Sequence, residues 1–283
     1  MKRRELLQCG VALGLGPAMA RAGAASPALR VGLTAVILAD QAAFLARWSD
    51  YLAKHASLTV NFVARESYQA ILDMMFTDQL DAAWICGYPY VKHQSQLRLL
   101  AVPTFHGAPR YQSYLIRSKG SSILGWKDLR GQVLAYSDPL SNSGWLVAQM
   151  QLRRAGLSPR DLSRSFFAHG HRNVAEAVAT GLAQAGCIDG YVWETMLGQG
   201  MPSIAKTEVV WKSTEFGFPP IVARAGDHNE ALSALGAALI QMPDDPMGRD
   251  LLKALNLSGF TTATPALFDS IRELANAVHG NKA

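Results

Sequence analysis

The chain has 283 residues, of which 49% are apolar and 17% are charged, and its formal net charge at neutral pH is +5. This length is enough for two small domains, and the composition is typical of a folded globular protein, which excludes an intrinsically disordered chain. Without residues 1–25 the net charge falls by 3 to +2, and no Lys/Arg cluster with interleaved aromatic residues remains, so we expect no nucleic-acid partner.

Residues 1–25 have the pattern of a signal peptide. A basic stretch over 2–4 precedes an apolar run over 6–20, and small residues within 18–24 offer cleavage sites. The apolar run is too short for a membrane anchor, so we expect cleavage and no stable membrane insertion. The arginine pair permits a twin-arginine signal, but Glu5 follows it directly, which favours the Sec pathway without deciding between the two.

Two of the three cysteines, Cys86 and Cys187, lie outside this signal peptide. An exported protein can form disulfides, and the sequence alone does not settle whether these two are oxidised. No Cys/His spacing resembles a zinc site, so we expect neither a metal nor a cofactor.

Strands and helices are expected to alternate along the chain. In the first part, strands are predicted over 29–36, 58–64 and 80–85, with helices over 40–54 and 68–76 between them. This alternation predicts a mostly parallel sheet with helices on both faces, in which ligands bind beyond the carboxyl ends of the strands. Thr34, Cys86 and Ser141 all follow predicted strands and are therefore candidates for a binding site.

The later part of the chain continues the pattern. Punctuating residues over 106–109 mark a first crossing between two domains, and a second crossing is expected near 211–216. Further strands are predicted over 99–103, 114–117, 132–136, 164–168, 188–193, 208–211 and 216–223, and helices from 145 to about 156 and over 174–182, 229–241, 246–255 and 265–278.

The most informative stretch is 135–145, which runs from a predicted strand through a hydroxyl-rich turn into a helix. Ser141, Asn142 and Ser143 fall at the helix N-terminus, where side-chain oxygens cap and the first N–H groups are unpaired. Free N–H groups at such a terminus attract anions. An ordinary helix cap would explain a single Ser, whereas three polar residues followed by Gly144 favour an anion site.

A resemblance to a known family starts from this stretch. The motifs Trp126-Lys127-Asp128-Leu129-Arg130-Gly131, Asp138-Pro139 and Ser141-Asn142-Ser143-Gly144 resemble those of the periplasmic phosphonate, phosphite and phosphate binding subunits of ABC importers. That family usually has Ser-Thr-Ser-Gly in the turn, and its hydroxyl groups and backbone amides hold the oxyanion. Asn142 replaces the middle Thr, which leaves the identity of the anion open.

The resemblance implies an α/β fold of the bilobal periplasmic binding protein type, with two mixed-sheet α/β lobes joined by two hinge crossings. We assign residues 1–25 to the signal peptide, 26–110 plus 214–283 to lobe 1, and 111–213 to lobe 2. The mature protein is expected in the periplasm as a monomer. A Cys86–Cys187 disulfide would have to bridge the lobes and lock the cleft between them, so we do not expect one.

The resemblance also implies roles for single residues. The family often has a ligand-contacting Tyr near Cys86, so this Cys either packs as a small apolar residue or turns its thiol toward the ligand. His171 corresponds to a ligand-contacting His, and Tyr191 ends a predicted strand from which relatives read the substituent of the ligand. Tyr88 is the better of two tyrosines that could offer a hydroxyl group to an oxyanion, and Thr34 ends the first strand.

These residues predict a periplasmic receptor that closes over a small oxyanion of the phosphate, phosphite or phosphonate type and delivers it to an ABC permease. The alternative is a sensor that binds arsenite or another thiophile through Cys86 and signals to the periplasmic domain of a histidine kinase. The main catalytic motifs, among them Gly-x-Ser-x-Gly, His-Glu-x-x-His and the P-loop, are absent from the sequence, so we expect no enzyme.

Overall fold

The fold is described from a computed structural model, which covers residues 28–34 and 42–280. The predicted signal peptide lies outside the described residues, and so does the predicted start of the first helix at 40. Within the described part of the chain, no helix is both long and apolar enough to cross a membrane.

The first lobe is built on a six-stranded sheet with the order β11-β4-β10-β3-β1-β2. Strand β3 is buried along its whole length, as expected for a central strand that is covered on both faces. The strands of this sheet are β1 (Leu29–Leu33), β2 (Val60–Ala64), β3 (Ala82–Trp84), β4 (Leu97–Thr104), β10 (Ile221–Arg224) and β11 (Gly259–Thr261).

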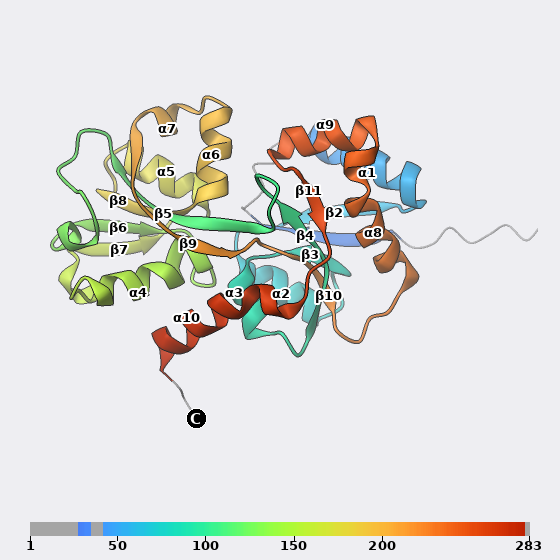
Figure 1. The fold of residues 1–283 in the computed structure, drawn as a ribbon, viewed down its shortest axis with the longest axis horizontal. Helices are drawn as coiled ribbons and strands as arrows, with labels where there is room; N and C mark the ends of the chain where they lie inside the picture. The colour runs from blue at the N-terminus through green and yellow to red at the C-terminus, as the bar shows by residue number, and fades with distance from the viewer. Residues whose placement is uncertain (1–27, 35–41, 281–283) are drawn as a thin grey trace, which may run out of the picture.

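Helices cover both faces of this sheet. One face carries α1 (Ala42–Ala56), α8 (Glu230–Ile240) and α9 (Pro246–Leu255), and the other carries α2 (Tyr68–Phe76), α3 (Gly87–Lys92) and α10 (Asp269–His279) (Figure 1). Local sequence fixes the ends of α9, because Asp245 caps its first N–H groups and Asn256 ends it in the left-handed conformation at φ 55°.

The second lobe is built on a five-stranded sheet with the order β7-β6-β8-β5-β9. Helix α4 covers one face, and α5, α6 and α7 cover the other (Figure 1). The strands are β5 (Arg110–Ser118), β6 (Val133–Tyr136), β7 (Arg164–Phe167), β8 (Ala185–Asp189) and β9 (Thr207–Gly217), and the helices are α4 (Val147–Arg154), α5 (His171–Ala179), α6 (Gly190–Gly198) and α7 (Pro202–Ala205).

Both sheets are mixed, as the family resemblance implied. The mostly parallel sheet expected from the alternation alone is wrong, because β10, β4 and β11 pair antiparallel in one lobe and β5 pairs antiparallel with β8 and β9 in the other. Strands β4, β5, β9 and β10 flank the two crossings between the lobes. A hydrogen bond joins the two crossing segments, in which the Phe218 N–H donates to the Pro109 carbonyl at 2.9 Å.

One predicted strand is wrong in its second half. The strand expected over 188–193 ends at Asp189, and helix α6 begins at Gly190. Asp189 accepts hydrogen bonds from the N–H groups of Tyr191 and Val192 and so starts a helix. Tyr191 therefore lies in the first turn of a helix.

The two lobes share an apolar interior. Phe218 lies 5.8 Å from Tyr111 and 5.0 Å from Tyr191, measured between ring centroids, and all three rings are buried. Cys86 and Cys187 are both buried free thiols, as expected from the argument against a disulfide. The aromatic contacts continue from the crossings into the space between the lobes, so this arrangement of the lobes is a closed one.

A pair of glycine substitutions tests the packing of α9. A Cβ atom at Gly248 would lie 2.1 Å from the Met242 carbonyl oxygen, which is backbone and cannot rotate away. We expect Gly248→Ala to lower the free energy of unfolding by about 1–3 kcal/mol in urea denaturation. Gly198→Ala is the matched control, because no atom lies within 4 Å of its Cβ position, and it should be neutral or stabilising by up to about 1 kcal/mol. Equal effects of the two changes would contradict this packing.

Candidate ligand-binding site

Polar residues collect where strands of the two sheets end between the lobes. Thr34 follows β1, Ser137 and Asp138 follow β6, and Asp189 ends β8. Their side chains have between 1% and 6% of their surface exposed. Because the carboxyl ends of parallel neighbours meet at one edge of a sheet, each lobe brings its polar residues to the edge that faces the other lobe.

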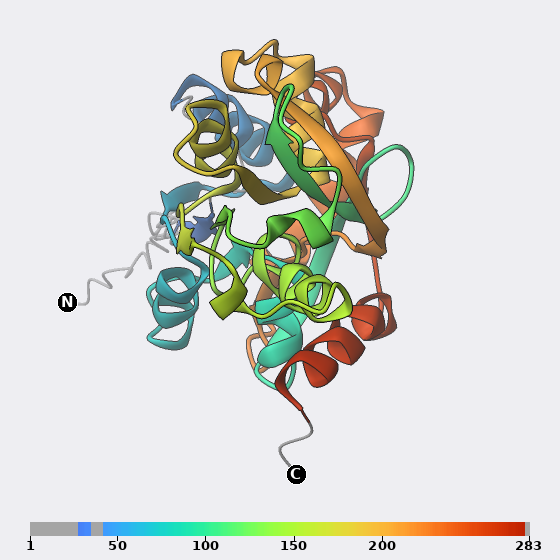
Figure 2. The same cartoon turned by 90° about the vertical axis from the view of Figure 1, so that its left-hand side faces the viewer.

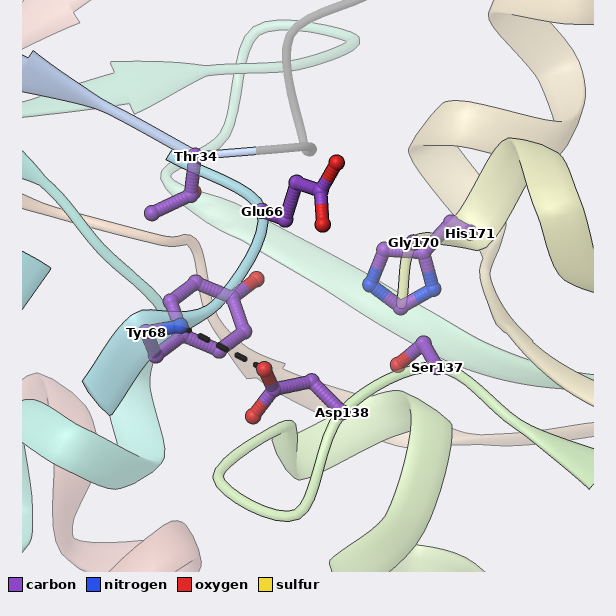
Figure 3. Close-up of a pocket in the computed structure, with 7 residues that line it drawn as sticks. All are labelled: Thr34, Glu66, Tyr68, Ser137, Asp138, Gly170 and His171. Atoms are coloured by element: carbon purple, nitrogen blue, oxygen red, sulfur yellow. Dashed lines mark hydrogen bonds between the residues drawn. The ribbon is translucent and has the colours of Figure 1, made fainter. Parts of the chain in front are cut away.

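A small pocket lies between these strand ends (Figure 3). Thr34, Glu66 and Tyr68 line it from the first lobe, and Ser137, Asp138, Gly170 and His171 line it from the second lobe. About 10 Å³ of it is open to the centre of a water-sized sphere, which is the room of about one water molecule, and no Lys or Arg is among these lining residues. The Tyr68 N–H donates to Asp138 Oδ2 at 3.3 Å and so joins the two lobes beside the pocket.

The turn Ser141–Gly144 lies directly beside Ser137. Ser141 caps the turn by accepting a hydrogen bond from the Gly144 N–H at 2.9 Å, and a π-helical turn, η2 (Asn142–Leu146), leads into α4. A Cβ atom at Gly144 would lie 1.8 Å from Ser137 Oγ, so only glycine permits this approach. Ser141, Asn142 and Ser143 are completely buried, and the predicted helix cap at Ser141 is confirmed.

Three polar atoms in this region have no hydrogen-bond partner among the residues that the structure describes. They are Ser137 Oγ, Ser143 Oγ and Asn142 Oδ1, and all are buried. A buried polar atom without a partner costs about 1–3 kcal/mol of stability, so such atoms are rare and call for an explanation. A hydroxyl group can donate to an oxyanion, which would remove the cost at both serines.

His171 supplies a further donor. Its Nδ1 accepts the Asp189 N–H at 3.0 Å, which leaves the proton of the neutral ring on Nε2. Burial lowers the pKa of His171 to about 3, so the ring is neutral at physiological pH. His171 is the first residue of α5, whose N-terminus has no side-chain cap because Gly170 precedes it. The ring and the uncapped helix end lie beside Ser137 (Figure 3).

Two carboxyl groups near the pocket are engaged by backbone N–H groups, whereas Glu66, which also lines the pocket, is exposed. Asp138 accepts from the N–H groups of Leu140 and Tyr68, and Asp189 caps α6. Burial raises the pKa of both, to about 8 for Asp189, although these backbone hydrogen bonds partly oppose the shift. An anion placed in this pocket would therefore be attracted by hydroxyl groups, the neutral imidazole and helix N-termini.

A comparison with known families decides what this arrangement represents. Residues 35–268 match the family described as "ABC transporter, phosphonate, periplasmic substrate-binding protein". The chain belongs to this family. It is 30% identical over 224 residues to the phosphate-import protein PhnD of Mycolicibacterium smegmatis, an alignment that covers 74% of this chain and 67% of the relative.

Solved structures of this fold agree. A binding protein component of an ABC phosphonate transporter from Pseudomonas aeruginosa superimposes with a TM-score of 0.81 at 20% identity, over 89% of this chain and 87% of that chain. PhnD1 from Prochlorococcus marinus in complex with methylphosphonate gives a TM-score of 0.77 at 20% identity, over 89% and 98% of the two chains. Both are bilobal periplasmic binding proteins in fold, which confirms the fold predicted from the sequence.

Cys86 lies where the two lobes meet. It precedes α3, and its Sγ accepts the Asn142 N–H at 3.3 Å and lies 4.0 Å from the Tyr111 hydroxyl oxygen. Burial raises the pKa of the Cys86 thiol to about 11, so it is protonated at neutral pH. The thiol thus contacts the turn that was predicted to hold the anion, and it does so as a neutral group.

Two predicted site residues use their hydroxyl groups elsewhere. The Tyr88 hydroxyl lies 2.8 Å from His279 Nε2 in α10, and the Tyr191 hydroxyl donates to the Leu255 carbonyl across the lobes at 2.5 Å. Neither residue is among those lining the pocket. Their roles as ligand contacts stay predictions, with an opposing observation in each case, whereas Thr34 and His171 do line the pocket.

Other pocket residues were not predicted from the sequence. Tyr68, Ser137, Asp138 and Glu66 line the pocket, and Tyr111 accepts a hydrogen bond from the Asn142 side chain at 3.0 Å. The signal for Ser137 and Asp138 was present, because they follow a buried strand directly. Tyr68 follows the helix cap Ser67, but only the contact with Asp138, 70 residues away, brings it into the site.

The buried imidazole gives a test by pH. As pH falls from about 6.5 toward 3, His171 takes up a proton in the unfolded chain but not in the folded one, so folding loses stability by up to about 1.4 kcal/mol per pH unit. His171→Gln removes this loss, and its stability relative to the unchanged protein should therefore rise on acidification. Denaturation with urea at a series of pH values measures the difference.

The control for this experiment is His228→Gln, because His228 is exposed. Its stability relative to the unchanged protein should stay constant with pH. A constant difference for His171→Gln as well would show that the ring is not held neutral by burial.

Proposed function

We propose that this chain is a periplasmic receptor that closes over one small phosphorus oxyanion, such as phosphate, phosphite or a small phosphonate, and delivers it to an ABC importer. The carrying observation is that Ser137 Oγ, which is buried and unpaired among the described residues, lies in the pocket with the neutral donor His171. Membership of the family and the binding proteins named above support the same class of ligand.

The size and charge of the pocket restrict the ligand. The closed pocket has room for about one water molecule, since about 10 Å³ is open to the centre of a water-sized sphere, so a small anion needs some separation of the lobes and a bulky substituent is disfavoured. Hydrogen bonds from hydroxyl groups and ring N–H groups to a charged acceptor contribute about 1.5–3 kcal/mol each, so several of them provide useful affinity without a cation. The identity of the substituent then depends on the residues that face the Ser141–Gly144 turn, including Cys86.

The remaining parts of the proposal concern the chain as a whole. We propose that residues 26–110 with 214–283 and residues 111–213 move as two lobes about the crossings, and that 1–25 is removed on export. The protein acts as a monomer, presents the closed form to a permease, and performs no chemistry on its ligand. Incubation with phosphate esters or thiol esters should therefore show binding at most, without turnover.

A thermal-shift screen tests the ligand class. The mature protein is heated with phosphate, phosphite, methylphosphonate, sulfate or arsenite, and so is its Cys86→Ser variant. A ligand at ~100 times its dissociation constant adds roughly 2.7 kcal/mol to the free energy of unfolding, which raises the melting temperature clearly. We expect stabilisation by a phosphorus oxyanion in both proteins, because a neutral thiol and a hydroxyl group can both accept the Asn142 N–H.

The other outcomes of this screen are equally clear. Stabilisation by arsenite alone, lost in Cys86→Ser, would replace the proposal with the sensor alternative. No response to any of these anions would contradict the anion site itself, although the fold would stand.

A second prediction addresses the serine hydroxyl in the pocket. Ser137→Ala removes one buried donor, and we expect the dissociation constant of the oxyanion to rise roughly 10-fold or more in isothermal titration calorimetry. Gly144→Ala should do at least as much, because its methyl group would occupy the position of Ser137 Oγ. Ser270→Ala is the control, since its hydroxyl is also buried and unpaired within the described part of the chain but lies in α10 outside the pocket. Equal affinities for all three variants would refute the assignment of Ser137.

A further inference from the structure

The C-terminal helix α10 is anchored on the first lobe at its start. Ile271 packs on Gly87 so closely that a Cβ atom at Gly87 would lie 2.6 Å from Ile271 Cδ1. Arg272 Nη2 donates to Gln94 Oε1 at 2.6 Å just beyond α3. Toward its C-terminal end the helix lies beside α4 of the second lobe while it keeps its contact with α3, and Figures 1 and 2 show it along the lower side of the molecule.

The end of α10 is bound by the second lobe. Arg153 in α4 donates from Nη1 to the Ala277 carbonyl at 2.9 Å and from Nη2 to the Val278 carbonyl at 2.6 Å. The last carbonyl groups of a helix lack partners within the helix and carry partial negative charge. A guanidinium group from the other lobe therefore caps α10 both by hydrogen bonding and by charge.

Three rings complete the contact beside this cap. Tyr88 of α3 and His279 of α10 lie 6.2 Å apart, and each stacks on Trp145 of η2, at 6.4 Å and 5.8 Å between centroids. The Tyr88 hydroxyl is also 2.8 Å from His279 Nε2. We refer to Tyr88, Trp145, His279 and Arg153 together as the outer cluster. Two of its members come from each lobe.

The outer cluster is separate from the pocket but shares a turn with it. None of its four residues lines the pocket. Trp145 directly follows Gly144, so one short turn carries the buried serines on one side and the stacked indole on the other. Separation of the lobes would pull Tyr88 and His279 away from Trp145 and would break the Arg153 bonds to α10.

We propose that the outer cluster is an interlobe latch that sets the ligand affinity of this receptor from outside the pocket, by raising the population of the closed form before ligand binds. The apparent dissociation constant of a ligand that binds the closed form is the intrinsic constant divided by the fraction of closed molecules. Contacts that never touch the ligand can therefore change its affinity. The identity of the ligand depends on the proposed function, whereas the argument for the latch depends only on the contacts between the lobes.

The first experiment measures closure without ligand. Donor and acceptor dyes are attached to two introduced cysteines, Lys54→Cys at the end of α1 and Lys127→Cys in the second lobe. The dyes react at these positions because the native Cys86 and Cys187 are only 1% and 0% exposed. We expect His279→Ala and Arg153→Ala to shift the single-molecule energy-transfer distribution of the unliganded protein toward the open form. Arg153→Lys keeps the charge but lacks the planar fork that places one nitrogen atom on each carbonyl group, and it should give an intermediate shift.

The second experiment measures affinity for inorganic phosphate, phosphite and methylphosphonate. His279→Ala and Arg153→Ala should raise the dissociation constant about 5–10-fold, mainly through faster dissociation. Asn276→Ala is the matched control, because Asn276 is exposed on the same helix, and it should change neither closure nor affinity.

The two readouts separate failure of the latch from failure of the proposed function. Unchanged energy transfer in both alanine variants would refute the latch whether or not any oxyanion binds. A shift in energy transfer with unchanged affinity would refute its control of binding. If the unchanged protein binds none of the three anions, the proposed function fails, and the latch is then judged by the energy-transfer distributions alone.

Discussion

The proposed binding site depends on a buried hydroxyl group, on Ser137, that has no partner among the described residues, and Ser143 in the adjoining turn has another. A protein of marginal stability tolerates such groups only where another interaction, such as a hydrogen bond to a ligand, compensates for their loss of hydration. Two neighbouring residues fix their positions. Gly144 has no side chain and so lets Ser137 approach the turn, and Ser141 caps the turn. The surrounding fold can be understood as the support for these two positions.

That support comes from both lobes. Strand β6 and helix α5 hold Ser137 and His171 in the second lobe, and the Tyr68 N–H reaches Asp138 from the first. Cys86 meets the Asn142 N–H at the same junction. Two of the hydrogen bonds between the lobes thus involve residues at or beside the pocket, so separation of the lobes would take the proposed site apart. The outer cluster adds contacts on the far side of the same turn.

Local signals made the turn predictable and the family resemblance made the bilobal fold predictable, whereas contacts between residues far apart in the sequence could not be predicted. Ser141 to Gly144 could be recognised because capping residues stand directly before a helical pattern. Tyr191 was assigned to a strand because aromatic and β-branched residues suit strands, whereas Asp189 in fact caps a helix there. Tyr88 was assigned to the ligand because nothing local shows that His279, 191 residues later, lies 2.8 Å from its hydroxyl.

None of the described residues that line the pocket is a Lys or Arg, and this bears on the effect of salt on ligand binding. Attraction between exposed charges weakens as ionic strength rises, whereas short hydrogen bonds in a closed, buried site are screened far less. A space outside the cytoplasm shares the salt content of the external medium. If the proposed anion is held by dipoles and hydroxyl groups, its affinity should change little between media of low and high salt content.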